Sequence, residues 1–190
     1  NGKRNGRGRM ETGDRYVYDG GWSNGEKDGE ATITYADGAT YTGGMSAGLR
    51  DGQGRLEAAD GLVYEGEWAG GQITGTGTLT LPGGEVYTGE LASGARQGQG
   101  RMEYIDGAVY EGAFAADRRE GQGSLTRPDG YNYTGSWLGG RIEGAGEVVY
   151  PDGAVYRGDF RDDLPAGRGT ITYPDGSVYE GEWDAGVIQG

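Results

Sequence analysis

The chain has 190 residues, 44 of them glycine, and carries 17 Lys and Arg against 30 Asp and Glu, a net charge of −13. It contains no Cys and no His, which excludes disulfides, the common zinc and haem ligand sets, and Ser-His-Asp or Cys-His catalysis within this chain. The acidic balance disfavours nucleic acid as a partner. No apolar run approaches the roughly 20 residues of a membrane-spanning helix. We therefore expect a non-enzymatic protein without cofactor, metal or catalytic residues, soluble or peripheral, in a compartment that the sequence does not reveal.

A tyrosine recurs at a constant interval, without insertion, and begins each repeat of a tandem array. Glycine stands two positions after the tyrosine, and a large apolar residue stands four positions after it. Every Trp and Phe of the chain occupies this second position. Two further glycines stand later in the repeat, at the positions of Gly75 and Gly77, with Ala31 as an exception. The repeats begin at Tyr18, Tyr41, Tyr64, Tyr87, Tyr110, Tyr133, Tyr156 and Tyr179.

The elements follow in the same order in every repeat. Residues 1–17 hold glycines in the late positions of a repeat, and the chain ends within another, so we expect one continuous array over residues 1–190 with partial repeats at both ends, cut from a longer protein. The tyrosine, glycine and apolar residue alternate with polar residues, which predicts a strand with one patterned face. A second strand carries the late glycines, and pairing the aromatic position with the first of them would place each ring over a glycine.

Asp-Gly turns join the repeats, as at Pro128-Asp129-Gly130. A three-residue loop with a glycine bulge keeps every tyrosine on the same face, whereas a two-residue loop would reverse it. The predicted fold is therefore all-β: a single-layer antiparallel β-meander solenoid of repeated β-hairpins, elongated and twisted.

Tyr64-Glu65-Gly66-Glu67-Trp68, followed by Gly71, Gly75 and Gly77, resembles the MORN (membrane occupation and recognition nexus) repeat. The resemblance extends over the whole chain and implies a repeat scaffold. Relatives attach such repeats to varied activities, so the resemblance implies little about the particular function. Some relatives bind helical segments along the concave side, and others have been linked to phosphoinositides.

The aromatic face is the candidate partner-binding surface, because a single-layer sheet leaves large apolar side chains without a second layer. Packing within the curl of the sheet is the alternative for each ring. The favoured function is a scaffold for protein–protein interaction that binds a helical segment along this face, with self-association through the open sheet ends as a second mode. The predicted contact residues are Tyr64, Trp68, Tyr87, Tyr110, Phe114, Tyr133, Trp137, Tyr156 and Phe160.

Other functions stay open. A peripheral membrane module that recognises lipid headgroups is one, although the net charge does not favour it. A targeting array of a larger enzyme is another. The aspartate of each Asp-Gly turn could suggest a calcium site, but the preference of turns for aspartate explains its recurrence. The glutamates beside the aromatic positions are expected to be solvated rather than catalytic.

Overall fold

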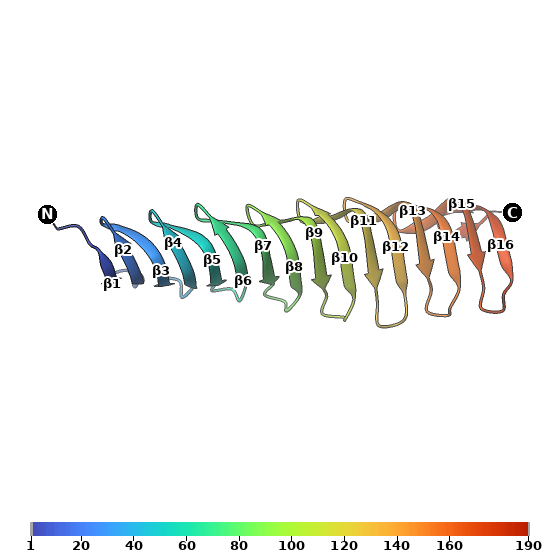
Figure 1. Cartoon of the computed structure of the whole chain (residues 1–190). Coiled ribbons are helices and arrows are strands. Elements are labelled where there is room, and N and C mark those ends of the chain that lie inside the picture. The colour runs from blue at the N-terminus through green and yellow to red at the C-terminus, as the bar shows by residue number, and fades with distance from the viewer. Residues whose placement is uncertain (1, 190) are drawn as a thin grey trace. The chain divides into compact units, whose positions relative to one another are not determined.

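The computed structural model describes residues 2–189. Over this range the chain has no helix and forms 17 strands in an antiparallel hairpin meander, so the predicted all-β fold is confirmed (Figure 1). Between residues 2 and 189 there is accordingly no helical segment long and apolar enough to cross a membrane.

The chain divides after Ala95 into two compact units. The strands of the first unit are β1 (Gly6–Glu11), β2 (Val17–Ser23), β3 (Glu26–Thr34), β4 (Thr40–Ser46), β5 (Leu49–Glu57), β6 (Val63–Ala69), β7 (Gln72–Thr80) and β8 (Val86–Ala92). From the boundary onward come β9 (Ala95–Glu103), β10 (Val109–Ala115), β11 (Arg118–Thr126), β12 (Asn132–Leu138), β13 (Arg141–Val149), β14 (Val155–Arg161), β15 (Leu164–Thr172), β16 (Val178–Asp184) and β17 (Val187–Ile188).

A bulge interrupts the hairpin within a repeat. In β6 and β7, Gly66 pairs with Gly77, but Trp68 pairs with Ile73, so that Glu67 stands opposite three residues. Gly75 lies in this bulge with a φ of +63°, a left-handed conformation that favours glycine. The bulge therefore explains why the first of the two late glycines recurs along the array.

The expected pairing of ring and glycine exists, but it joins neighbouring repeats. Trp68 of β6 pairs with Gly52 of β5, which belongs to the preceding repeat. The ring that covers glycines within a hairpin is the tyrosine: a methyl group on Gly77 would stand 2.6–2.8 Å from atoms of the Tyr64 ring and hydroxyl. The predicted pairing of the aromatic position with the first late glycine is therefore confirmed, but between neighbouring repeats, because within a hairpin the bulge pairs Trp68 with Ile73 instead.

Two kinds of turn link the strands. Between the two strands of a repeat lies a two-residue turn with both φ angles positive, as at Asn24 (+52°) and Gly25 (+93°), which matches the twist of a hairpin. Between repeats, the amide of Gly38 donates to the backbone carbonyl of Tyr35, and the amide of Tyr35 donates to the carbonyl of Ala39. These two hydrogen bonds close a three-residue loop. This is the predicted loop with a glycine of positive φ, and it keeps the tyrosines on one face.

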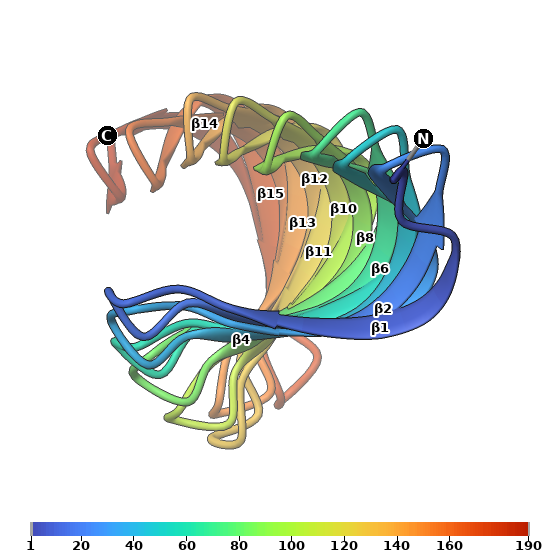
Figure 2. The same cartoon turned by 90° about the vertical axis from the view of Figure 1, so that its left-hand side faces the viewer.

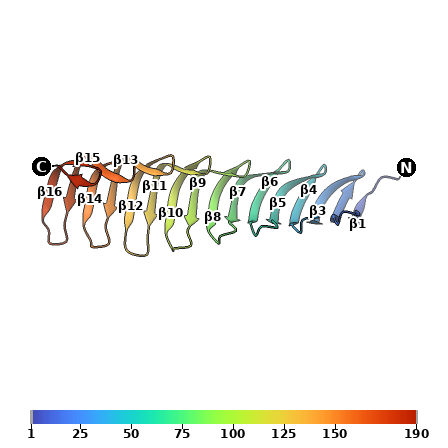
Figure 3. The ribbon, with the colours of Figure 1, turned by 180° about the vertical axis from the view of Figure 1, so that it is seen from behind.

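The hydrophobic core of each unit lies on one face of a single layer. The repeat tyrosines from Tyr18 to Tyr156 have no exposed surface, although no second sheet or helix covers them among the described residues. A single layer can bury large side chains only by curving around them, and the strands curve strongly when viewed end-on (Figure 2). Within each unit the hairpins follow one another in sequence (Figure 3). The face that carries the tyrosines, called the aromatic face below, is therefore the concave one. The opposite face is called the polar face.

Candidate functional site

The nine predicted contact residues all lie on the aromatic face, and all nine are buried. The five tyrosines among them are 0 % exposed, and Trp68, Phe114, Trp137 and Phe160 are 3–4 % exposed. The structure brings them together as the core of their own units, so their rings are the floor of this face and most of their surface is unavailable to a partner.

The rings interlock in edge-to-face pairs. In the second unit the Trp137 ring lies 5.2 Å from that of Tyr110 and 5.3 Å from that of Tyr133, and Tyr133 in turn lies 5.2 Å from Phe160. Aromatic rings favour this geometry, and each such pair adds about 1 kcal/mol beyond burial alone. The aromatic position thus links its own tyrosine to the tyrosine of the preceding repeat.

Each buried tyrosine hydroxyl has a fixed acceptor. Tyr110 donates to the carbonyl of Ala113 at 2.9 Å, and Tyr133 donates to that of Ser136 at 3.0 Å. Burial, the main cause, raises the pKa of Tyr41, Tyr110 and Tyr156 to about 12. The phenols are consequently protonated at neutral pH and act as structural donors.

Cations stand over several of these rings. The Arg50 guanidinium lies 4.1 Å from the ring centroid of Trp68, and that of Arg119 lies 4.2 Å from the centroid of Trp137. Each also donates to a turn carbonyl of the next repeat, Arg119 to Gly140 at 2.8 Å. These residues stand nine positions after the repeat tyrosine and shield the rings from water.

Each unit has a cavity that opens on the aromatic face. The cavity of the first unit, called the Tyr16 cavity, has a volume of about 420 Å³. The cavity of the second unit, called the Tyr131 cavity, has a volume of about 460 Å³. The Tyr16 cavity is lined by Tyr16, Lys27, Ile33, Tyr35, Met45, Gly48, Leu49, Arg50, Gly70, Gly71 and Gln72. The Tyr131 cavity is lined by Arg119, Leu125, Arg127, Tyr131, Trp137, Ile142, Tyr150, Phe160, Asp163, Leu164 and Pro165.

A pair of tyrosines forms part of the wall of each cavity. Tyr131 and Tyr150 meet edge to face with centroids 6.4 Å apart, and Tyr16 and Tyr35 meet in the same way at 5.9 Å. Burial raises the pKa of Tyr131, Tyr150 and Tyr35. Sequence reasoning did not select these residues as contact residues. A second tyrosine spacing in the sequence could have indicated them. Tyr16 and Tyr35 are separated by the same number of residues as Tyr131 and Tyr150, and the two members of each pair belong to successive inter-repeat turns.

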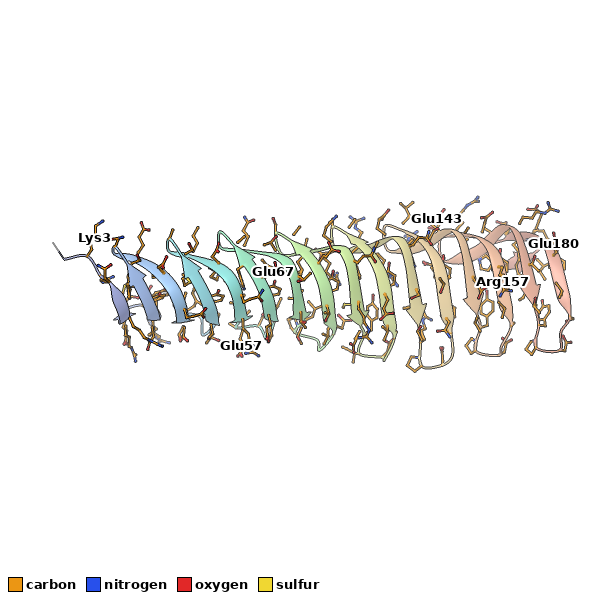
Figure 4. All side chains as sticks on the ribbon, viewed as in Figure 1. Lys3, Glu57, Glu67, Glu143, Arg157 and Glu180 are labelled. Atoms are coloured by element: carbon orange, nitrogen blue, oxygen red, sulfur yellow. The ribbon has the colours of Figure 1, made fainter. Side chains whose placement is uncertain are left out.

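The polar face carries exposed ion pairs rather than an acid–base site. The Nε of Arg101 lies 2.9 Å from a carboxylate oxygen of Glu111, and both side chains are well exposed. Glu67, labelled in Figure 4, accepts hydrogen bonds from the hydroxyl and amide of Thr76, which lower its pKa. Arg157, also labelled there, pairs with Glu147. A general acid would need a raised pKa, whereas that of Glu67 is lowered.

The turn aspartates serve the turns. Asp37 accepts the amide of Ala39 at 3.0 Å, and Asp152 accepts that of Ala154 at 2.9 Å. Across residues 2–189 no group of three or more acidic side chains is arranged to hold a metal ion.

The comparisons with known proteins agree with this architecture. The family model described as MORN repeat matches residues 1–15, 18–40, 41–63, 64–86, 87–109, 110–130, 133–155, 156–178 and 179–190. No curated protein matches the chain.

Among solved structures, the chain is similar to the G-box domain of the microcephaly protein CPAP, with a TM-score of 0.57, 12 % identity and 95 % coverage of each chain. It is also similar to the SAS-4 (dCPAP) TCP domain of Drosophila melanogaster, solved in complex with a proline-rich motif of Ana2 (dSTIL). That match has a TM-score of 0.50 and 13 % identity, and it covers 92 % of this chain and 88 % of the other. At such identities the likeness concerns the fold alone.

Proposed function

Because the chain belongs to the MORN repeat family, we propose that it is a non-enzymatic scaffold that binds a protein partner, with a helical segment of that partner lying along the concave aromatic face. The repeat array and its likeness in fold to a domain that was solved with a bound motif support an interaction scaffold. The SAS-4 domain was solved with a proline-rich motif bound, which supports the use of such a sheet for holding a peptide.

The observation that carries this proposal is the pair of cavities on the aromatic face. Tyrosine, leucine and arginine side chains line the Tyr131 cavity above a floor that includes Trp137 and Phe160. Leu164 beside them is 46 % exposed. Aromatic and arginine side chains around apolar surface are the composition that protein-binding hot spots favour.

The nine aromatic residues then have a supporting role in the proposal. Their buried rings fix the shape of the concave face, and the side chains above them make most of the contact. Substituting Trp68 or Trp137 would damage the core of its unit, so a binding test needs the exposed wall residues instead.

The test is calorimetric titration of the purified chain with a partner identified by crosslinking. We expect Tyr131→Ser combined with Tyr150→Ser to weaken binding at least tenfold while the circular dichroism spectrum stays native, because the wall of the cavity is lost. The control is Ile105→Ser, which changes an apolar residue that is 70 % exposed at a turn. Equal loss in the control, or unchanged affinity in the double variant, would argue against this face as the binding surface.

A further inference from the structure

The Tyr16 cavity of the first unit gathers two cations on an aromatic surface. We propose that it binds a carboxylate side chain of an acidic amphipathic segment, with Lys27 and Arg50 as the groups that recognise it. This inference rests on the proposed function and specifies the chemistry of the partner.

Neither cation is neutralised within the described part of the chain. No carboxylate oxygen of residues 2–189 lies within ion-pair distance of the Lys27 ammonium or the Arg50 guanidinium. Lys27 donates to the hydroxyl of Tyr16, and Arg50 donates to the carbonyl of Gly71 at 3.3 Å. The nearby carboxylate of Asp51 accepts the amide of Gly70 at 3.2 Å. Lys27 and Arg50 therefore have hydrogen-bond donors to spare.

Aromatic rings hold both cations at the cavity wall. The Lys27 Nζ lies 4.6 Å from the ring centroid of Tyr16, and the Arg50 guanidinium lies 4.1 Å from that of Trp68. A side chain placed in this way loses less conformational freedom when it pairs with an anion than a free surface lysine does. The cavity is thus prepared for a carboxylate.

Charge complementarity identifies the occupant as acidic. The chain has a net charge of −13, yet the residues that line the Tyr16 cavity include two cations and no Asp or Glu, whereas Asp163 lines the Tyr131 cavity beside its arginines. The Tyr16–Tyr35 pair and Leu49, which is 52 % exposed, add apolar surface at the same cavity. A segment that presents a carboxylate one helical turn from an apolar side chain would satisfy both parts of this surface.

The second unit contains the corresponding cavity, but with uncharged residues in place of Lys27 and Arg50. Its own two arginines, Arg119 and Arg127, line a different part of the cavity together with Asp163. Each of its corresponding residues stands five repeats further along the sequence, so that Tyr131, Tyr150 and Leu164 correspond to Tyr16, Tyr35 and Leu49. At the positions of Lys27 and Arg50 the second cavity has Ile142 and Pro165. Ile142, together with Ile73 of the first unit, shows that a hairpin accepts isoleucine at this repeat position.

The experiment selects helix-forming peptides from a displayed library in which the surface positions vary among Glu, Gln and Lys. Wild-type protein is compared with the double variant Lys27→Ile and Arg50→Ile, whose new residues already occur at this repeat position. We expect wild type to enrich Glu beside an apolar residue and the variant to lose that enrichment. In fluorescence anisotropy the selected peptide should bind the variant at least tenfold more weakly, and its Glu→Gln form should bind wild type equally weakly.

The control is Arg161→Ala with Arg168→Gln, which removes the same charge from exposed positions where other repeats have alanine and glutamine. It should retain the affinity of wild type. Selection of no peptide by any form would overturn the proposed function itself. Selected peptides without Glu enrichment, or enrichment that survives Lys27→Ile and Arg50→Ile, would overturn only the carboxylate site. Binding to phosphatidylserine vesicles that the double variant loses, without Glu enrichment, would assign the cations to a lipid surface instead.

Discussion

At the residue scale, Gly66, the glycine two positions after Tyr64, leaves no room for a side chain. A Cβ on Gly66 would lie 2.5 Å from the hydroxyl of Tyr64 and 2.6 Å from both the Cα of Gly77 and the carbonyl oxygen of Thr76. Backbone atoms on the partner strand cannot yield as a flexible side chain can. Gly66→Ala should therefore lower the free energy of unfolding by about 3 kcal/mol.

Chemical denaturation followed by circular dichroism measures this loss, with Gly13→Ala as the matched control. A Cβ on Gly13 meets no atom within 4 Å, so its stability should change by less than about 0.5 kcal/mol. A Gly66→Ala protein as stable as this control would show that the tyrosine hairpin has more freedom than its packing implies.

The buried tyrosines predict a sensitivity to alkaline pH. Burial holds the pKa of Tyr41, Tyr110 and Tyr156 at about 12, whereas an unfolded tyrosine ionises near pH 10. Above pH 10 the unfolded chain binds fewer protons than the folded chain, so stability is complete below pH 10 and falls as the pH rises through 12. Absorbance at 295 nm should report the ionisation of these phenols together with the loss of the circular dichroism signal. Ionisation of all 14 tyrosines near pH 10 with the fold intact would contradict this expectation.

At the element scale, the turn within each repeat determines how well its hairpin closes. Ala47 has a φ of +47° in the two-residue turn that it shares with Gly48, a conformation that costs alanine more than asparagine. Ala47→Asn would reproduce the Asn24-Gly25 turn of the preceding repeat and should stabilise the chain by about 0.5 kcal/mol, seen as a higher melting temperature. Ala36→Asn, at an exposed turn residue without positive φ, is the control and should leave the melting temperature unchanged. An equal rise in both would attribute the effect to composition rather than to backbone conformation.

The inter-repeat turns were predictable from sequence, and the bulges were not. Asp-Gly at a fixed spacing, together with the need to keep Tyr35 and its equivalents in phase, was enough to identify the three-residue loop. The glycine of the bulge, such as Gly75, was visible in the sequence, but its φ of +63° depends on a register shift that no local pattern reveals. The same shift places the aromatic position between two tyrosines. The alternation of residues was enough to assign the predicted contact residues to one face. Predicting that they are buried would have required knowledge of the curvature of the sheet.

At the scale of the whole molecule, stability should be local, because pairing joins each strand to its neighbours in sequence. Within the first unit, the amide of Gly71 donates to the backbone carbonyl of Arg50 in the preceding repeat at 2.8 Å. In the second unit the amide of Gly140 donates to the carbonyl of Arg119 at 2.9 Å. Repeated links of this kind make the free energy of a repeat protein approximately a sum of repeat and nearest-neighbour terms. Such a chain opens in segments rather than all at once.

Hydrogen exchange followed by mass spectrometry can test this local stability with the Gly66→Ala protein. The amides of β6 and β7 should exchange at least tenfold faster than in wild type, since their hairpin carries the clash, while the amides of β14 and β15 should exchange at the wild-type rate. Gly13→Ala should leave both regions unchanged. A uniform rise in exchange over all strands would mean that the chain unfolds as one cooperative body. In that case a partner seated on one cavity would stabilise every repeat, whereas local stability confines the effect of a bound segment to the hairpins that it touches.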